Sequence, residues 1–218
     1  MPGRDSSLAG YRAKRDFTKT PEPAGEAEAS GEPFQRFVVQ RHRARRLHYD
    51  LRLEMGGVLA SWAVPKGPTL DPRERRAAFH VEDHPVEYLH FEGVIPKGEY
   101  GGGDVTVWDE GLWAPARERE PSSPEEAVRQ GELHFDVAGH KLRGRFALVR
   151  TGVDAGGKER WLLLKKRDRY AVEGWSPEDH PRSVLSGRTN DEVKADPERL
   201  WLSSRPVGQA EVYLKRST

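Results

Sequence analysis

The sequence predicts a mostly β protein with antiparallel strands, arranged as a sandwich or a barrel. Three observations support this prediction. Between Phe34 and Arg169 the apolar residues fall into short runs of about six to ten residues; these runs are rich in β-branched and aromatic side chains; and Gly, Pro or Asp separates the runs. The runs occupy residues 35–40, 45–54, 57–64, 77–83, 88–95, 104–109, 132–139, 142–150 and 160–168.

The segment before the strands, residues 1–33, is expected to be a flexible arm. It is rich in Gly, Pro, Ala, Glu and Ser and holds few large apolar side chains. Residues 11–23 mix aromatic and basic side chains. Two interpretations are therefore open: a disordered arm, or an arm that folds over a functional site.

Glycine and proline residues place the expected turns and helices. Gly56 and Gly57 separate two of the runs as the turn of a hairpin would. Residues 122–132 carry helix signals, with Ser and Pro at the start and Gly131 at the end. After Arg169 the chain is polar and turn-rich, with one short helix expected near residues 190–195. The predicted organisation is an arm (1–33), a domain (34–170), and a polar tail or interdomain linker (171–218).

The composition limits the kinds of site and of partner. The 26 arginines outnumber the 10 lysines, and an arginine fork binds phosphate well, although biased codon usage would give the same excess. A net charge of +1 argues against a non-specific polycation, yet residues 36–52 hold six arginines and one acid, Asp50. With no cysteine, a metal site must use nitrogen and oxygen ligands.

The expected location is the cytoplasm. The absence of cysteine fits a reducing compartment. The chain shows no apolar run of the ~18 residues that a membrane helix needs, and its N-terminus lacks the hydrophobic stretch of a signal peptide.

The most informative segment runs from Gln40 to Glu54. In a strand over residues 47–54, three leucines and a tyrosine face one side, and the polar face lies opposite; that face comprises His48, Asp50, Arg52 and Glu54. His42 joins the polar face if residues 43–46 form a bend. Such a face suits a metal and an anionic substrate, whereas the plainer alternative is the solvated side of a half-buried strand.

Other basic and histidine residues give weaker signals. Two imidazoles and a carboxylate suit Mn²⁺, Fe²⁺ or Zn²⁺ with open coordination positions. His84 precedes Pro85, which favours an extended backbone at a strand end, and it is either part of the site or an ordinary loop histidine. Lys66 and Arg76 are candidate phosphate contacts or solvated charges. The glycine-rich residues 97–103 lack the Walker A ending, so a mobile hairpin end is the favoured interpretation.

Four segments identify a family. YRAKRDFTKTPEP, FVVQRHRARRLHYDLRLEMGGVLASWAVPKGPTLDP, HVEDHPVEYLHFEGVIPKGEYGGGDVTVWDEG and WLLLKKRD resemble the 3′-phosphoesterase module of bacterial ATP-dependent DNA ligase D and its free-standing relatives, over about residues 11–170. The resemblance implies a compact β-barrel that holds one Mn²⁺. It also implies removal of a 3′-terminal ribonucleoside from DNA, followed by hydrolysis of the remaining 3′-phosphate to a 3′-hydroxyl for repair and ligation.

The resemblance also implies roles for individual residues. His42, His48 and Asp50 would hold the metal. His84 and Arg52 would contact the scissile phosphate, with further catalytic positions nearby at Arg76, Tyr88, Lys66 and Glu82. Arg15, Asp16, Glu22 and Gln40 match positions that bind substrate or support it, the first three in the ribonucleoside-removing step.

The expected partners are a DNA primer-template with a 3′-ribonucleotide or 3′-phosphate end, ligase and polymerase domains, and a DNA end-binding protein, with no membrane. The sequence offers no obvious covalent nucleophile, so we expect direct attack by water, with a protonated His84 assisting. Lys166 to Arg169 reads KRDR, so the ligase motif Lys-x-Asp-Gly is missing.

Two other functions are considered. The first is a non-haem iron oxygenase in which His134 or His140 joins His48 and Asp50; replacing His42 would leave that enzyme little affected. The second is a noncatalytic nucleic-acid module with steeply salt-dependent binding, which would leave a 3′-phosphorylated primer unchanged in Mn²⁺.

Overall fold

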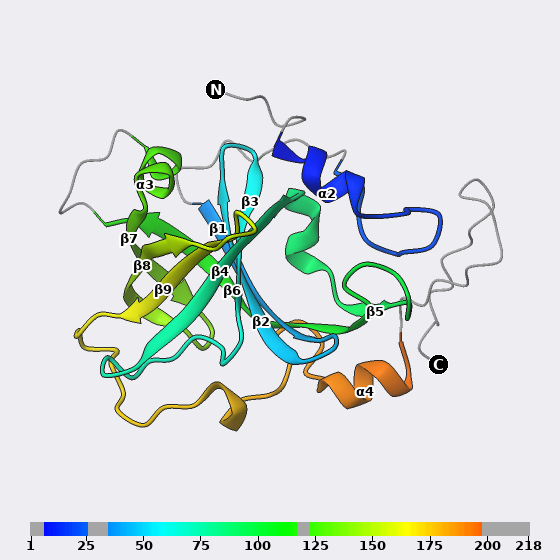
Figure 1. Ribbon diagram of the computed structural model, residues 1–218. Helices are drawn as coiled ribbons and strands as arrows, with labels where there is room; N and C mark the ends of the chain where they lie inside the picture. The colour runs from blue at the N-terminus through cyan, green and yellow to red at the C-terminus, as the bar shows by residue number, and fades with distance from the viewer. Residues whose placement is uncertain (1–6, 26–34, 117–122, 198–218) are drawn as a thin grey trace.

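The computed structural model describes residues 7–25, 35–116 and 123–197 (Figure 1). Residues 1–6 and 26–33 of the predicted flexible arm and residues 198–218 of the predicted tail lie outside these ranges.

The described chain forms a nine-stranded antiparallel sheet in the order β1-β2-β3-β4-β9-β8-β7-β6-β5. Additional pairing of β1 with β6 closes eight of the strands into a barrel, and β5 extends the sheet beside β6. This confirms the predicted fold class and selects the barrel over the sandwich. The strands are β1 Gln35–Arg43, β2 Leu47–Met55, β3 Val58–Val64, β4 Arg75–His84, β5 Gly93–Ile95, β6 Gly103–Pro115, β7 Glu132–Gly139, β8 Arg143–Val153 and β9 Glu159–Lys165.

One predicted strand differs. The first half of the run 88–95 belongs to a 3₁₀ helix, η1 (Val86–His90), and only its last residues form β5. The cause is Pro85, whose fixed φ of −67° and free carbonyl start a tight turn: the Tyr88 N–H donates to the Pro85 carbonyl at 3.0 Å. The apolar residues of the run indicate that the segment is buried. A 3₁₀ helix packed against the barrel buries them as well as a strand would.

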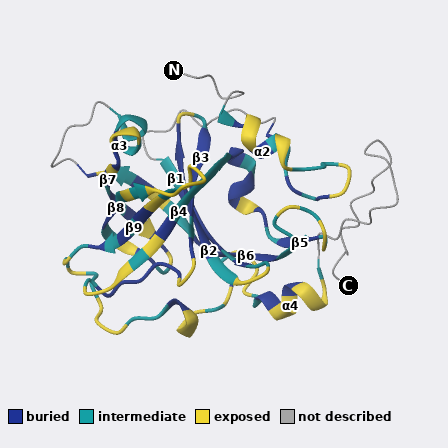
Figure 2. Cartoon of the chain, viewed as in Figure 1, coloured by how far each residue is buried: buried dark blue, intermediate teal, exposed yellow. Residues whose placement is uncertain are grey.

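The barrel has two apolar clusters, one in its interior and one on the part of its outer face that η1 covers. The interior cluster draws on all eight closed strands and includes Leu51 and Leu53 of β2. A second cluster on the outer face joins Val38 of β1 and Leu59 of β3 to Tyr88 of η1. Figure 2 shows the resulting burial of β1 to β3. The polar face of β2, predicted from alternation, therefore lies on the outside of the barrel and is covered by other segments.

The described part of the N-terminal arm folds onto the barrel. Helix α2 (Ala9–Ala13) contacts β4, and its Tyr11 side chain is fully buried, with its hydroxyl donating to the Pro23 carbonyl at 2.8 Å. Residues 7–25 thus lie against the barrel.

Two other helices agree with the sequence. Helix α3 (Pro124–Gln130) begins after the N-cap Ser123 and ends at Gly131, whose φ of 92° is left-handed. Helix α4 (Asn190–Ala195) begins with a capping box and contacts β1, β5 and β6 (Figure 1). Residues 171–197, which also include η2 (Pro177–Asp179), hence lie on the barrel.

Candidate active site

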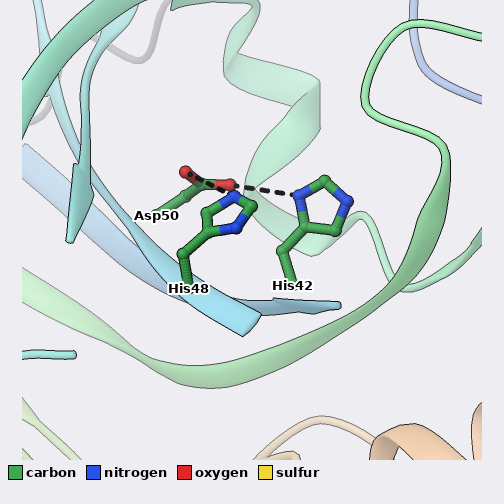
Figure 3. Close-up of side chains that lie close together, drawn as sticks. All are labelled: His42, His48 and Asp50. Carbon is green, nitrogen blue, oxygen red and sulfur yellow. Dashed lines mark ion pairs between the residues drawn. The ribbon is translucent and has the colours of Figure 1, made fainter. Parts of the chain in front are cut away.

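The β1–β2 hairpin brings three candidate metal ligands together. Residues 44–46 form a bend, so His42 lies opposite His48 in the ladder and both face outward. Asp50 follows two residues further along β2, on the same face. Figure 3 shows the two imidazoles and the carboxylate converging, and their ligand atoms lie within 4.8 Å of one another.

Backbone carbonyls orient both imidazoles. His42 Nε2 lies 2.7 Å from the Gly101 carbonyl oxygen, and His48 Nδ1 lies 3.1 Å from the Arg46 carbonyl oxygen. Because a carbonyl only accepts, each of these nitrogens carries the proton and donates. His42 Nδ1 and His48 Nε2 therefore keep free lone pairs, and each lies 3.6 Å from a different oxygen of Asp50.

This donor set fits a divalent transition metal. A separation of 3.6 Å is too long for a hydrogen bond, so the lone pairs face a common space instead of bonding to the carboxylate. Burial opposes ionisation of Asp50, but the neighbouring Arg52 charge holds the pKa of its carboxyl well below the usual range. Two nitrogens and an ionised oxygen, with each imidazole held by a carbonyl, are the arrangement expected around such an ion.

Arg52 lies beside the candidate metal ligands in the cavity lining. Its side chain is almost fully buried, and its Nε, Nη1 and Nη2 groups donate to Gln40 Oε1, Ser61 Oγ and Asp50 Oδ2, at 2.8, 2.9 and 3.3 Å. The Gln40 amide in turn donates to two carbonyls at the end of η1. Gln40 and Ser61 thereby fix the direction of the guanidinium.

His84 contacts the N-terminal arm. Its Nδ1 lies 2.9 Å from the Glu82 carbonyl oxygen, so this nitrogen is protonated, and its Nε2 accepts from Arg15 at 3.2 Å. Burial, together with the charges of Arg52 and Arg15, lowers the pKa of His84 well below its usual value. In the substrate-free protein His84 is thus neutral, in contrast to the protonated state expected from the sequence.

A buried carboxylate attaches the arm to η1. Glu22 accepts hydrogen bonds from Arg15 Nε at 2.8 Å, from the Tyr88 hydroxyl at 2.9 Å and from the Thr20 hydroxyl at 2.7 Å. Arg15 also pairs with Glu82 at 3.3 Å. Two residues of the arm therefore belong to the same hydrogen-bonded network as His84.

These groups surround a cavity of about 190 Å³. Of the residues predicted from the sequence, the following line it: Arg15, Glu22, His42, His48, Asp50, Arg52, Glu82, His84 and Tyr88. Gln40 lies beneath Arg52. Sequence reasoning did not single out the other lining residues: Ala44, Ala63, Val81, Ile95, Tyr100 and Gly101.

Besides Gln40, three predicted residues do not line the cavity. The Asp16 carboxylate accepts from Thr18 and pairs with Lys19 at 3.0 Å, Lys66 is exposed in the turn after β3, and Arg76 lies on β4 opposite Leu163. The oxygenase alternative meets the same difficulty, because neither His134 nor His140 lines the cavity with His48.

The glycine-rich residues 97–103 form hydrogen-bonded turns beside the site. The Glu99 N–H donates to Pro96 and the Gly102 N–H donates to Glu99, which makes two consecutive turns. A Cβ at Gly103 would lie 2.1 Å from the Arg43 carbonyl oxygen, so glycine is required where the segment passes β1. The sequence suggested a mobile hairpin end for this segment. In the structure the segment positions the Gly101 carbonyl to accept a hydrogen bond from His42 Nε2.

A stability prediction arises from Asp83, between Glu82 and His84. Burial and the Glu82 charge raise the pKa of Asp83 to about 6. A raised pKa in the folded state means that stability is present at acid pH and is lost as the pH rises through about 6. Asp83→Asn is therefore expected to raise the free energy of unfolding by about 1–3 kcal/mol at pH 8, and the gain should shrink towards pH 4. Urea unfolding in chelator checks this, with the exposed Asp179→Asn as control. An equal gain at both pH values would contradict it.

The fold and the site together define a class: a small antiparallel β-barrel with a candidate metal centre on its outer face and two buried arginines beside it. The family model for the DNA ligase D 3′-phosphoesterase domain matches residues 40–150. The chain belongs to this family.

Three relatives are similar over most of this chain, and each is named as a multifunctional non-homologous end joining protein LigD. The Pseudomonas aeruginosa protein is 48% identical over 186 residues, 84% of this chain and 21% of that protein. The Mycolicibacterium smegmatis protein is 45% identical over 175 residues, 79% and 22% of the respective chains. The Mycobacterium bovis protein is 45% identical over 169 residues, 76% and 21%. The chain thus spans about a fifth of the length of these relatives.

No helix in the described parts of the chain is long and apolar enough to cross a membrane.

Proposed function

We propose that this protein is a Mn²⁺-dependent 3′-end-healing phosphoesterase that acts on DNA. It removes a 3′-terminal ribonucleoside and then the 3′-phosphate, leaving a 3′-hydroxyl. The observation that carries this proposal is the shared cavity: the candidate metal ligands, the buried Arg52 and His84 all line it. A cavity with a metal ion and fixed cationic donors suits an anionic ester.

The substrate and partners follow from the family and the relatives. Relatives named for non-homologous end joining support a role at broken DNA ends. We propose a primer-template as the substrate, ligase and polymerase domains and a DNA end-binding protein as partners, and the cytoplasm as the location. Residues 1–33 would then be an arm that contributes to the site, residues 34–170 the catalytic domain, and residues 171–218 a tail or linker whose first part lies on the barrel.

His42, His48 and Asp50 would hold the ion. When bound, a divalent metal withdraws charge from phosphorus through a phosphate oxygen. Arg52 would stabilise the charge that develops on the other oxygens, since three of its five N–H donors make the bonds described above and the remaining two are available for phosphate.

His84 would act only once substrate is present. Its Nε2 accepts from Arg15, so a phosphate that binds both groups has to enter between them. Burial and the two arginine charges lower the pKa of His84. The negative charge of a bound phosphate would offset the arginines and favour the protonated imidazole, which can donate to the leaving oxygen. The attacking group would be water, without a covalent intermediate on the protein.

The test uses a 5′-labelled primer-template that ends in one ribonucleotide, incubated with Mn²⁺ or with chelator. We expect stepwise conversion to a 3′-phosphate and then a 3′-hydroxyl in Mn²⁺ alone. His42→Ala should abolish both steps, whereas the surface change His134→Ala should leave them unchanged. Salt-dependent binding of an unaltered primer would identify a noncatalytic module instead and would end the proposal.

A further inference from the structure

Tyr100 is unusual among the residues that line the site because its aromatic ring is exposed to solvent. Five large hydrophobic side chains in the described ranges are classed as exposed: Tyr100, Leu112, Val153, Val172 and Leu185. Tyr100 alone among them is aromatic, and it alone lines the cavity. With 47% of its surface in solvent, it holds a flat ring in the lining of a cavity whose other tyrosine, Tyr88, is buried.

The position of Tyr100 is tied to the metal candidates. The next residue, Gly101, has a left-handed φ of 75°, and its carbonyl accepts from His42 Nε2 at 2.7 Å. A Cβ at Gly102 would lie 2.7 Å from the Pro96 carbonyl oxygen, so the backbone of the turn is closely packed. The backbone of Tyr100 is therefore held one residue from a group that touches a candidate ligand.

Two cations of the arm lie at the ring. Lys14 Nζ is 5.0 Å from the ring centre and 3.4 Å from the Tyr100 hydroxyl, and the Arg15 guanidinium is 5.3 Å from the ring centre. Lys14 also pairs with Glu82 at 2.9 Å. The exposed ring thus sits among positive charges, the surroundings in which a nucleic-acid strand places a base on an aromatic side chain and a phosphate on a cation.

We propose that Tyr100 is a stacking platform for the nucleobase of the nucleotide that carries the scissile phosphate. This inference rests on the proposed function, because it takes the substrate to be a nucleic acid 3′ end. Stacking accepts any base, so Tyr100 would align the terminus over the metal without selecting sequence. It would also discriminate against phosphate esters that lack a base.

Single-turnover hydrolysis of a 3′-phosphorylated primer-template in Mn²⁺ tests the proposal. Tyr100→Ala is expected to raise the half-saturating protein concentration about tenfold and to leave the maximal rate unchanged. Tyr100→Phe keeps the ring but loses the hydroxyl that bonds Lys14, and it should behave as the wild type. On a primer whose terminal nucleotide is abasic, all three proteins should have the same half-saturating concentration.

A fluorescence measurement separates failure of this inference from failure of the proposed function. 2-Aminopurine at the 3′-terminal nucleotide should be quenched by the wild type and by Tyr100→Phe, and not by Tyr100→Ala. Quenching without phosphate release would refute the phosphoesterase and keep the platform. Phosphate release without quenching, or an equal loss by Tyr100→Ala on abasic and normal ends, would overturn the platform and keep the phosphoesterase.

Discussion

Asp50→Asn is expected to abolish high-affinity binding of divalent metal and, with it, phosphate release. The substitution keeps the shape of the side chain and removes the only anionic ligand of the candidate centre. Arg52 Nη2 lies 3.3 Å from the oxygen of Asp50. In the variant, a divalent ion would lie beside this guanidinium with no negative ligand to offset either positive charge. Loss of an outer partner costs about 10–100-fold in metal affinity, so loss of this ligand should cost more. Calorimetric titration with Mn²⁺ measures the effect.

Two further variants make the Asp50 result interpretable. The Asp50→Asn substitution leaves the buried Arg52 without its countercharge, which also lowers stability, so the folded fraction has to be followed by circular dichroism. His48→Ala removes a more exposed ligand and should lose metal with little loss of stability. His134→Ala removes an imidazole that bonds Glu132 and should bind metal normally. Unchanged Mn²⁺ affinity in both Asp50→Asn and His48→Ala would rule out the His-His-Asp centre.

Asn190→Ala is expected to lower the free energy of unfolding by at least about 3 kcal/mol. The Asn190 side chain is almost fully buried and uses its whole hydrogen-bonding capacity: it donates to the carbonyls of Arg41 and Asp104, both at 3.1 Å, and accepts from Arg41 and Thr106. Alanine would leave these groups buried without partners at the end of β1, next to His42.

The adjacent Asp191→Asn is the matched control for Asn190→Ala. The Asp191 side chain is 84% exposed and pairs with Arg43 on the surface, so its loss should lower stability far less than the loss of Asn190. Urea unfolding of the metal-free proteins compares the two variants. If Asn190→Ala unfolds at the same denaturant concentration as Asp191→Asn, the described part of the C-terminal segment adds little to the barrel.

The sequence predicted the strand face of the site because that information is local. The alternation of Leu51 and Leu53 with Asp50 and Arg52 follows directly from the pleat of one strand, and the structure places the two sets on opposite faces. His42 joins the polar face only if the chain bends between the two strands, which is also a local requirement. The β1–β2 register places His42 opposite His48 and so meets this requirement.

The remaining features depend on contacts between distant segments. Glu22, Tyr88 and Arg15 meet only after the arm lies on η1, and nothing in their spacing indicates this. Lys66 and Arg76 carry the right charge for phosphate, but the fold directs them away from the cavity. Residues 171–197 have a tail-like composition because few of their side chains are apolar, yet polar bonds such as those of Asn190 attach them to the barrel.

The hairpin also bears on how the protein folds. The candidate ligands span only His42 to Asp50, and a hairpin of this kind forms within about 1–10 μs. Barrel closure instead pairs Gln35 with Trp113, and the cover over the site needs the arm, so both require slower, long-range contacts. The candidate metal ligands are thus expected to assemble early by low-contact-order pairing, whereas Arg15 and His84 meet only late. An ion captured by the nascent hairpin would stabilise the β1–β2 pairing before the arm covers the site.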